Sequence, residues 1–123
     1  MPSRGGRNPA LRGTAFEREV VRDLTRRGYL CIRSAGSKGP VDVVALERPG
    51  IDQPGCGCPA LVQAKKDGRI TALERGKLFA LAQHNEVHAI IASRRDLRRE
   101  PGADPIRYRA VTGRDGEMED WEP

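Results

Sequence analysis

Apolar residues recur at helical spacing near the start of the chain, with charged residues in most of the other positions. Four of them fall on one helical face: Phe16, Val20, Val21 and Leu24. Gly28 follows as a stop signal, so the pattern predicts a helix over 14–27. Residues 1–12 are rich in Arg, Gly and Pro and lack this periodicity, and we expect a flexible basic arm there.

Short apolar runs bounded by Gly and Pro predict the strands of a sheet. Five such runs occur, three before a second helix and two after it, at 29–33, 41–46, 60–65, 87–92 and 106–111. The second helix is expected from Thr71 to about Asn85, because Thr71 and Glu74 form a T-x-x-E capping pattern. The order α-β-β-β-α-β-β predicts an α/β fold in which helices pack on a mixed sheet.

The chain has 123 residues, which suits one domain, and we assign 13–112 to it. The acidic stretch 113–123 is expected to be a disordered tail. No apolar run reaches the ~18 to 20 residues of a membrane span, and the start lacks the apolar core of a signal peptide. Three cysteines do not make a disulfide framework. These features predict a soluble, cytoplasmic protein.

Charge changes this picture, because the net charge of +5 hides a more basic body. The first 114 residues carry 22 basic and 12 acidic side chains, a surplus of +10, while the last nine residues carry five acids and no base. Lys and Arg neutralise phosphates and release condensed counterions, so a surplus of this size favours a polyanionic partner. Nucleic acid is the expected partner.

Asp42, Gln63 and Lys65 stand out on strands that hold few charged residues. Gln63 and Lys65 project to the same face because side chains alternate along a strand, and an adjacent antiparallel strand can bring Asp42 beside them. Carboxylate and amide oxygens bind Mg²⁺, and a nearby ammonium orients water or stabilises charge on a reacting phosphate. The three residues therefore predict metal-assisted phosphodiester hydrolysis.

Five sequence blocks stand in a fixed order along the chain: Gly13-Thr-Ala-Phe-Glu-Arg-Glu19, Gly28-Tyr29, Arg33-Ser-Ala-Gly-Ser-Lys38, Val41-Asp-Val-Val-Ala45 and Val62-Gln-Ala-Lys65. In order and spacing they resemble the archaeal-type Holliday junction resolvases (Hjc), a branch of the PD-(D/E)xK nuclease superfamily. The resemblance extends to about Val111. It implies a restriction-endonuclease-like core and a homodimeric endonuclease. The implied cofactor is Mg²⁺, with Mn²⁺ as a substitute, and the implied substrate is a four-way DNA junction cut in two opposed strands.

The resemblance also implies roles for single residues. Glu17, Asp42 and Gln63 are the implied metal ligands, and Lys65 is the implied catalytic lysine. Ser37 matches a serine placed near the scissile phosphate and joins the catalytic set. Arg18 and Arg33 match arginines that the family uses for DNA binding and cleavage, and we also expect DNA contacts from Arg12, Lys38 and Lys66.

Position 63 departs from the family pattern, which ordinarily has Glu before x-Lys. Gln leaves one neutral oxygen and removes one negative charge, so metal affinity should fall and a preference for Mn²⁺ could rise. A junction resolvase is the leading hypothesis. Two alternatives stay open: a repair- or restriction-type nuclease acting on duplex or flapped DNA, and a non-catalytic DNA-binding module with a decayed site.

The site residues have structural alternatives. Glu17 closes a Thr14-Ala-Phe-Glu17 capping pattern, Asp42 follows Pro40 and could close a turn, and Lys65 could be a solvated strand end.

Other polar residues stay without an assigned role. Cys56 and Cys58, with His84 and His88, could bind zinc, although two exposed thiols fit the spacing better. Arg94, Arg95, Arg98 and Arg99 would form a basic face in a helical turn, and Trp121 could pack on the body or on a partner.

Overall fold

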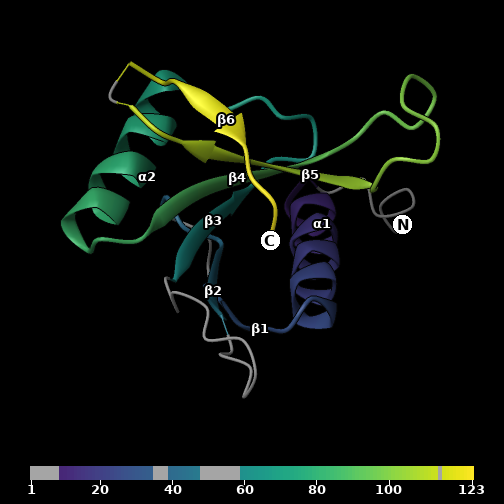
Figure 1. Ribbon diagram of the computed structural model, residues 1–123, viewed down its shortest axis with the longest axis horizontal. Helices are drawn as coiled ribbons and strands as arrows, with labels where there is room; N and C mark the ends of the chain where they lie inside the picture. The colour runs from purple at the N-terminus through teal and green to yellow at the C-terminus, as the bar shows by residue number, and fades with distance from the viewer. Residues whose placement is uncertain (1–8, 35–38, 48–58, 114) are drawn as a thin grey trace, which may run out of the picture.

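The protein is described by a computed structural model that covers residues 9–34, 39–47, 59–113 and 115–123 (Figure 1). It has two helices, α1 (Pro9–Arg26) and α2 (Ala72–His84). The strands are β1 (Tyr29–Arg33), β2 (Val43–Glu47), β3 (Ala60–Ala64), β4 (His88–Arg94), β5 (Ile106–Val111) and β6 (Met118–Asp120). The predicted α/β fold is confirmed, and β5 has the predicted bounds.

The six strands form one mixed sheet in sequence order, β1 to β6. Neighbouring strands are antiparallel except β3 and β4, which run parallel with Ala60 opposite His88. Parallel neighbours need a crossover connection, and α2 provides it. As a consequence, the segments that follow β3 and β4 emerge at the same edge of the sheet.

Each helix covers one face of the sheet (Figure 1). On α1, Phe16, Val20 and Leu24 pack against strand residues such as Val62 and Ile90. On α2, Leu78 and Ala82 pack against the alternate strand residues, including Leu61 and Ile91. Strand side chains alternate between faces, so consecutive apolar residues serve both layers. Polar residues of β3 can therefore be assigned to one helix or the other.

The first helix begins earlier than predicted, at Pro9 instead of Thr14. Pro is well tolerated in the first turn of a helix, where its missing N–H has no partner to lose. The expected arm over residues 1–12 is therefore wrong for 9–12. Because Thr14 lies inside the helix, it cannot be the N-cap, and the capping explanation for Glu17 is also wrong. The helix ends at Arg26, one residue before the predicted end, and Gly28 follows with a φ of 100°.

The C-terminal segment is not a disordered tail, which corrects the prediction for 113–123. Its strand β6 pairs with β5, and the backbone N–H of Trp121 donates to the carbonyl of Tyr108 at 2.9 Å. The Trp121 ring lies 6.1 to 6.2 Å from the rings of Tyr29, His88 and Tyr108. The acidic composition suggested disorder, yet this aromatic cluster holds the segment on the body.

In the described part of the chain, neither helix has the length and apolar character needed to cross a membrane.

Candidate active site at the ends of β2 and β3

Asp42 lies immediately before β2 and is fixed against β3 by two hydrogen bonds. Its backbone N–H donates to the carbonyl of Val62 at 2.9 Å, and its Oδ2 accepts from the N–H of Ala64 at 2.9 Å. The residue is 8% exposed. The second bond satisfies one carboxylate oxygen, and the carboxylate therefore has a fixed position beside β3.

Gln63 and Lys65 face α2, as the alternation along the strand predicts, and they meet there at one carboxylate. Lys65 Nζ lies 2.8 Å from Glu74 Oε2, and Gln63 Nε2 donates to the same oxygen at 3.3 Å. Glu74 comes from the first turn of α2. The structure thus brings Asp42, Gln63 and Lys65 to one end of the sheet and adds a fourth polar residue.

Sequence reasoning identified Glu74 only as a helix cap. The capping box is present, because Thr71 Oγ1 accepts from the Glu74 N–H at 3.1 Å and Glu74 Oε1 accepts from the Thr71 N–H at 3.2 Å. The cap occupies Oε1 and leaves Oε2 directed at Gln63 and Lys65. The sequence signal for such a residue is Gln63 itself, because a metal site that lacks a carboxylate on the strand needs one from another element.

The two carboxylates have pKa values shifted in opposite directions. Burial raises the pKa of Asp42, the Ala64 N–H and Lys65 oppose this, and the charge of Glu74 raises it further. The hydrogen bond from Lys65, followed by that from Thr71, lowers the pKa of Glu74 to about 2. Glu74 is therefore ionised at neutral pH, and Asp42 has an anionic neighbour.

The amide of Gln63 leaves one atom without a protein partner. Gln63 is 5% exposed, and its Oε1 is buried with no hydrogen-bond partner among the described residues. A buried acceptor without a donor is costly, and a cation would satisfy it. Carboxylate and amide oxygens are the ligands that Mg²⁺ and Mn²⁺ accept, so Asp42 and Gln63 fit such an ion.

A cation site at this place cannot consist of acidic side chains alone. Within the described ranges, no three His, Cys, Asp or Glu side chains form a group that could hold a metal ion. A cation site here therefore needs other ligands, and the Gln63 amide oxygen is one. The same finding gives no support for zinc at His84 and His88, while Cys56 and Cys58 lie outside the described residues.

Of the other residues expected at the site, the structure describes the side chains of Glu17, Arg18, Arg33 and Lys66. Glu17 is 5% exposed on α1, which covers the sheet face opposite α2. Arg18 is exposed on the same helix. Arg33 ends β1, and its charge lowers the pKa of Asp42. Ser37 and Lys38 lie outside the described residues, and of Arg12 only the helical backbone is described.

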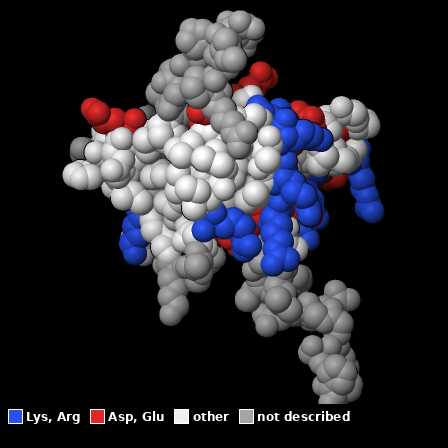
Figure 2. Space-filling model, turned by 90° about the horizontal axis from the view of Figure 1, so that it is seen from below, with Lys and Arg blue, Asp and Glu red and all other residues white. Residues whose placement is uncertain are grey.

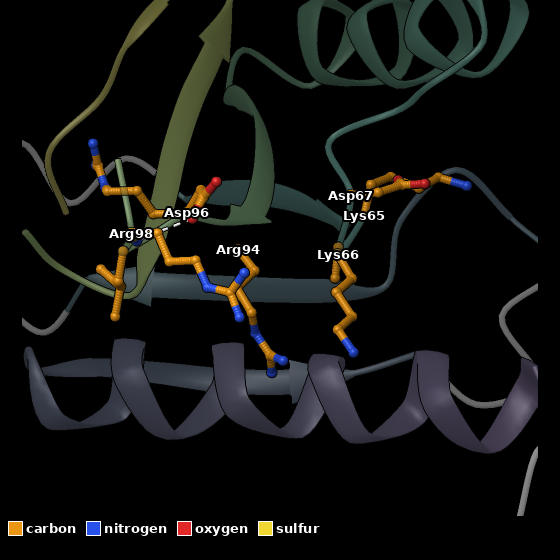
Figure 3. Close-up of a pocket in the computed structure, with 9 residues that line it drawn as sticks. Lys65, Lys66, Asp67, Arg94, Asp96 and Arg98 are labelled. Atoms are coloured by element: carbon orange, nitrogen blue, oxygen red, sulfur yellow. Dashed lines mark hydrogen bonds between the residues drawn. The ribbon is translucent and has the colours of Figure 1, made fainter. Parts of the chain in front are cut away.

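A basic hollow of about 830 Å³ lies beside the site, where β3 and β4 end (Figure 3). It is lined by Ala64, Lys65, Lys66, Asp67, Arg94, Arg95, Asp96, Leu97 and Arg98. The parallel pairing of β3 and β4 brings these segments together, with the Arg94 N–H donating to the Lys66 carbonyl at 3.0 Å. Five cations against two acids make this hollow attractive to phosphate.

The cations of this hollow differ in whether they are already paired. Arg94 forms an ion pair with Glu19 and lies over the Phe16 ring of α1, and Arg95 pairs with Glu100. Lys66 extends in the same direction as Arg94, away from Lys65 (Figure 3). Among the described residues, neither Lys66 nor Arg98 has an acid within ion-pair distance, so both are available to an anion.

Basic side chains also gather on the surface where α1 lies (Figure 2). Arg18, Arg22 and Arg26 on this helix are exposed. Part of the sequence's surplus of basic residues therefore lies on a surface near the hollow, as expected for a protein that binds a polyanion.

Comparison with known proteins agrees with this picture. The family model of the archaeal Holliday junction resolvase (Hjc) matches residues 8–51. The chain is also similar to the solved structure of Hjc from Archaeoglobus fulgidus, a Holliday junction resolvase from an archaeal hyperthermophile. The match has 25% identity and a TM-score of 0.55, and it covers 79% of this chain and 70% of that one. No curated protein matches the chain.

The sequence match covers α1, β1 and β2 with Asp42, and the structural match covers a larger share of the chain. Two independent comparisons thus give the same family that the motifs indicated. The resemblance of this chain to the archaeal Holliday junction resolvases (Hjc) is confirmed in both sequence and fold.

Proposed function

We propose that the protein is a structure-selective endonuclease that resolves four-way DNA junctions by paired phosphodiester hydrolysis. The observation that carries this proposal is the placement of Asp42, Gln63 and Lys65 together, beside a basic hollow, in an Hjc-like fold. A role on DNA carries with it a location inside the cell. A homodimer suits the substrate, because two identical sites related by a two-fold axis match the two-fold symmetry of a junction.

The proposed reaction uses a divalent cation, Mg²⁺ or in its place Mn²⁺. Asp42 and the Gln63 amide oxygen would hold it. Glu17 lies on α1, which covers the other face of the sheet, and it is proposed as a third ligand from the family resemblance alone. When bound, such an ion polarises the phosphate and lowers the pKa of water. Lys65 directs an ammonium at the same place, where it stabilises negative charge that develops on the scissile phosphate or orients the attacking water.

The DNA backbone would be held by the basic residues around this site. Arg33 lies close enough to affect Asp42, and Lys66 lines the hollow. Arg12, Arg18 and Lys38 extend the proposed surface, with Ser37 beside the scissile phosphate. Because such contacts are made to phosphates, junction selectivity would come from DNA shape and from the spacing of two sites in a dimer.

The test is cleavage of a labelled four-way junction and of a linear duplex with the same arm sequences, each with Mg²⁺, Mn²⁺ or EDTA. We expect paired, symmetric, metal-dependent nicks on the junction, resolved on a denaturing gel. Equal cutting of the duplex would make the protein a general nuclease. Binding without cutting under every metal would favour a DNA-binding module.

The basic hollow gives a separate prediction for DNA affinity. Lys66→Ala removes an unpaired cation, so junction binding should weaken and the slope of log K against log salt should fall by about one. Lys77→Ala, an equal change of charge on an exposed residue of α2, is the matched control and should leave the slope unchanged. Binding is measured by fluorescence anisotropy with EDTA present. Equal slopes for wild type and Lys66→Ala would remove this lysine from the DNA surface.

A further inference from the structure

Glu74 contacts both polar residues of β3 through a single oxygen. Its Oε2 accepts from Gln63 Nε2 at 3.3 Å and lies 2.8 Å from Lys65 Nζ. A helix cap requires only the other oxygen, Oε1, which accepts from the Thr71 N–H and hydroxyl at 3.2 and 3.1 Å. The capping role therefore accounts for the contacts of Oε1, and the contacts that Oε2 makes with β3 need another explanation.

The contact with Glu74 fixes which way the Gln63 amide points. A carboxylate only accepts hydrogen bonds, so the Nε2 side of the amide must face it. The amide oxygen is then held away from Glu74, and it is this buried Oε1 that has no hydrogen-bond partner among the described residues. Gln63 is 5% exposed, so bulk water does not satisfy that oxygen.

On the face of the sheet that α2 covers, the negative charge is also incomplete without Glu74, because Glu17 lies on α1 and α1 covers the other face. Gln63 is neutral, and Asp42 contributes one carboxylate against the Lys65 ammonium. Asp42 accepts from the N–H of Ala64, next to Gln63, and Glu74 accepts from the Gln63 amide, so the two carboxylates contact adjacent residues of β3. Two neighbouring carboxylates and an amide oxygen with no donor are an arrangement that a divalent cation would stabilise.

We propose that Glu74 supplies the carboxylate that position 63 lacks, adding a second negative charge beside Asp42 on the α2 face of the sheet and holding the Gln63 oxygen free for a divalent cation. This inference rests on the proposed nuclease function. The negative charge that the resembling family carries on the strand is, in this chain, carried by the first turn of α2.

A charge exchange tests the inference. Glu74→Gln removes the charge and keeps the helix cap, because Gln is also favoured at this position of a capping box. The double variant, Gln63→Glu with Glu74→Gln, returns one carboxylate to β3, and the amide introduced on α2 can donate to it. Glu119→Gln makes the same chemical change on exposed β6 and is the matched control. Thermal melting checks that every variant is folded.

The readout is Mn²⁺ binding by the protein without DNA, measured by electron paramagnetic resonance of the free ion and by calorimetry. We expect Glu74→Gln to weaken Mn²⁺ binding roughly 10- to 100-fold, the double variant to recover most of the loss, and Glu119→Gln to bind as wild type does. Wild-type affinity in Glu74→Gln, no recovery in the double variant, or no Mn²⁺ binding by the wild type would each overturn the inference.

Failure of this inference and failure of the proposed function give different results. A wild-type protein that binds Mn²⁺ through Glu74 but cuts no junction would overturn the function and retain the role of Glu74. A wild-type protein that cuts junctions, together with a Glu74→Gln variant that binds Mn²⁺ normally, would retain the proposed function and overturn the role of Glu74.

Discussion

Asp42→Asn and Lys65→Ala are each expected to lower junction cleavage at least about a hundredfold, the scale of a lost proton-transfer or charge-stabilising group. Asp42 is held in place by the Ala64 N–H, and Asn would keep its size while removing the charge that a cation requires. The Lys65 ammonium lies 2.8 Å from Glu74 Oε2, one of the carboxylate oxygens at the site. Single-turnover cleavage of a labelled junction at saturating protein measures the effect.

Junction binding should survive both substitutions. Asp42→Asn leaves every cation of the hollow in place, and Lys65→Ala removes one cation that already pairs with Glu74. Asp115→Asn and Lys77→Ala repeat the two chemical changes at exposed positions that neither line the hollow nor bond to the site residues, and they serve as controls. Cleavage at the wild-type rate by both Asp42→Asn and Lys65→Ala would refute the assignment of the active site. Loss of folding is checked by thermal melting of each variant.

The largest effect on stability is expected at Asp23, which joins α1 to β5. Its Oδ2 accepts from the Tyr108 hydroxyl at 2.7 Å and from Arg27 Nε at 3.0 Å, and Arg26 pairs with its other oxygen. Asp23→Asn should lower the free energy of unfolding by about 2 to 4 kcal/mol at pH 7, because a largely buried acceptor loses its charge while its donors remain. Urea unfolding followed by circular dichroism measures the loss.

The loss of stability in Asp23→Asn should become smaller as the pH falls. Burial acts to raise the pKa of Asp23, but the hydrogen bonds from Tyr108 and Arg27 outweigh it, so the pKa lies below the ordinary value of 3.8. A folded pKa below the unfolded one stabilises the protein above the unfolded pKa, and that stabilisation is lost as pH falls through the folded pKa. The difference between wild type and Asp23→Asn should therefore be full at pH 7 and shrink below about pH 4.

Two further variants separate the buried contact from the exposed ones. Tyr108→Phe removes one hydrogen bond and should cost about 1 kcal/mol. Asp104→Asn removes an exposed partner of Arg27, 3.4 Å away, and should cost less than about 1 kcal/mol. If Asp23→Asn were no more destabilising than Asp104→Asn, the network would not be a stabilising link between α1 and β5.

Local sequence pattern predicted most elements because its rules act over a few residues. Strand β5 alternates apolar and basic side chains and was predicted to the residue, and the cap between Thr71 and Glu74 is present. The same locality explains the errors. Pro9 reads equally well as a loop residue or as a helix start, and the acidic composition around β6 hid a strand whose place depends on Trp121.

The meeting of Asp42 with Gln63 and Lys65 followed from the sequence, because strand alternation and an antiparallel neighbour leave few other arrangements. The position of Glu74 did not follow. It lies nine residues beyond Lys65 along the chain, and its approach depends on how α2 packs on the sheet. The hollow required the parallel register of β3 and β4, which joins segments about thirty residues apart.

The sequence by itself determined the α/β class, the basic character and the three polar residues at the ends of the strands, since periodicity, charge and alternation are properties of short segments. Only the tertiary structure decided that the Gln63 oxygen has no partner, that Glu74 faces it, and that Lys66 lies beside Arg94. These are contacts between distant segments, and they exist only once the helices and strands have packed on one another.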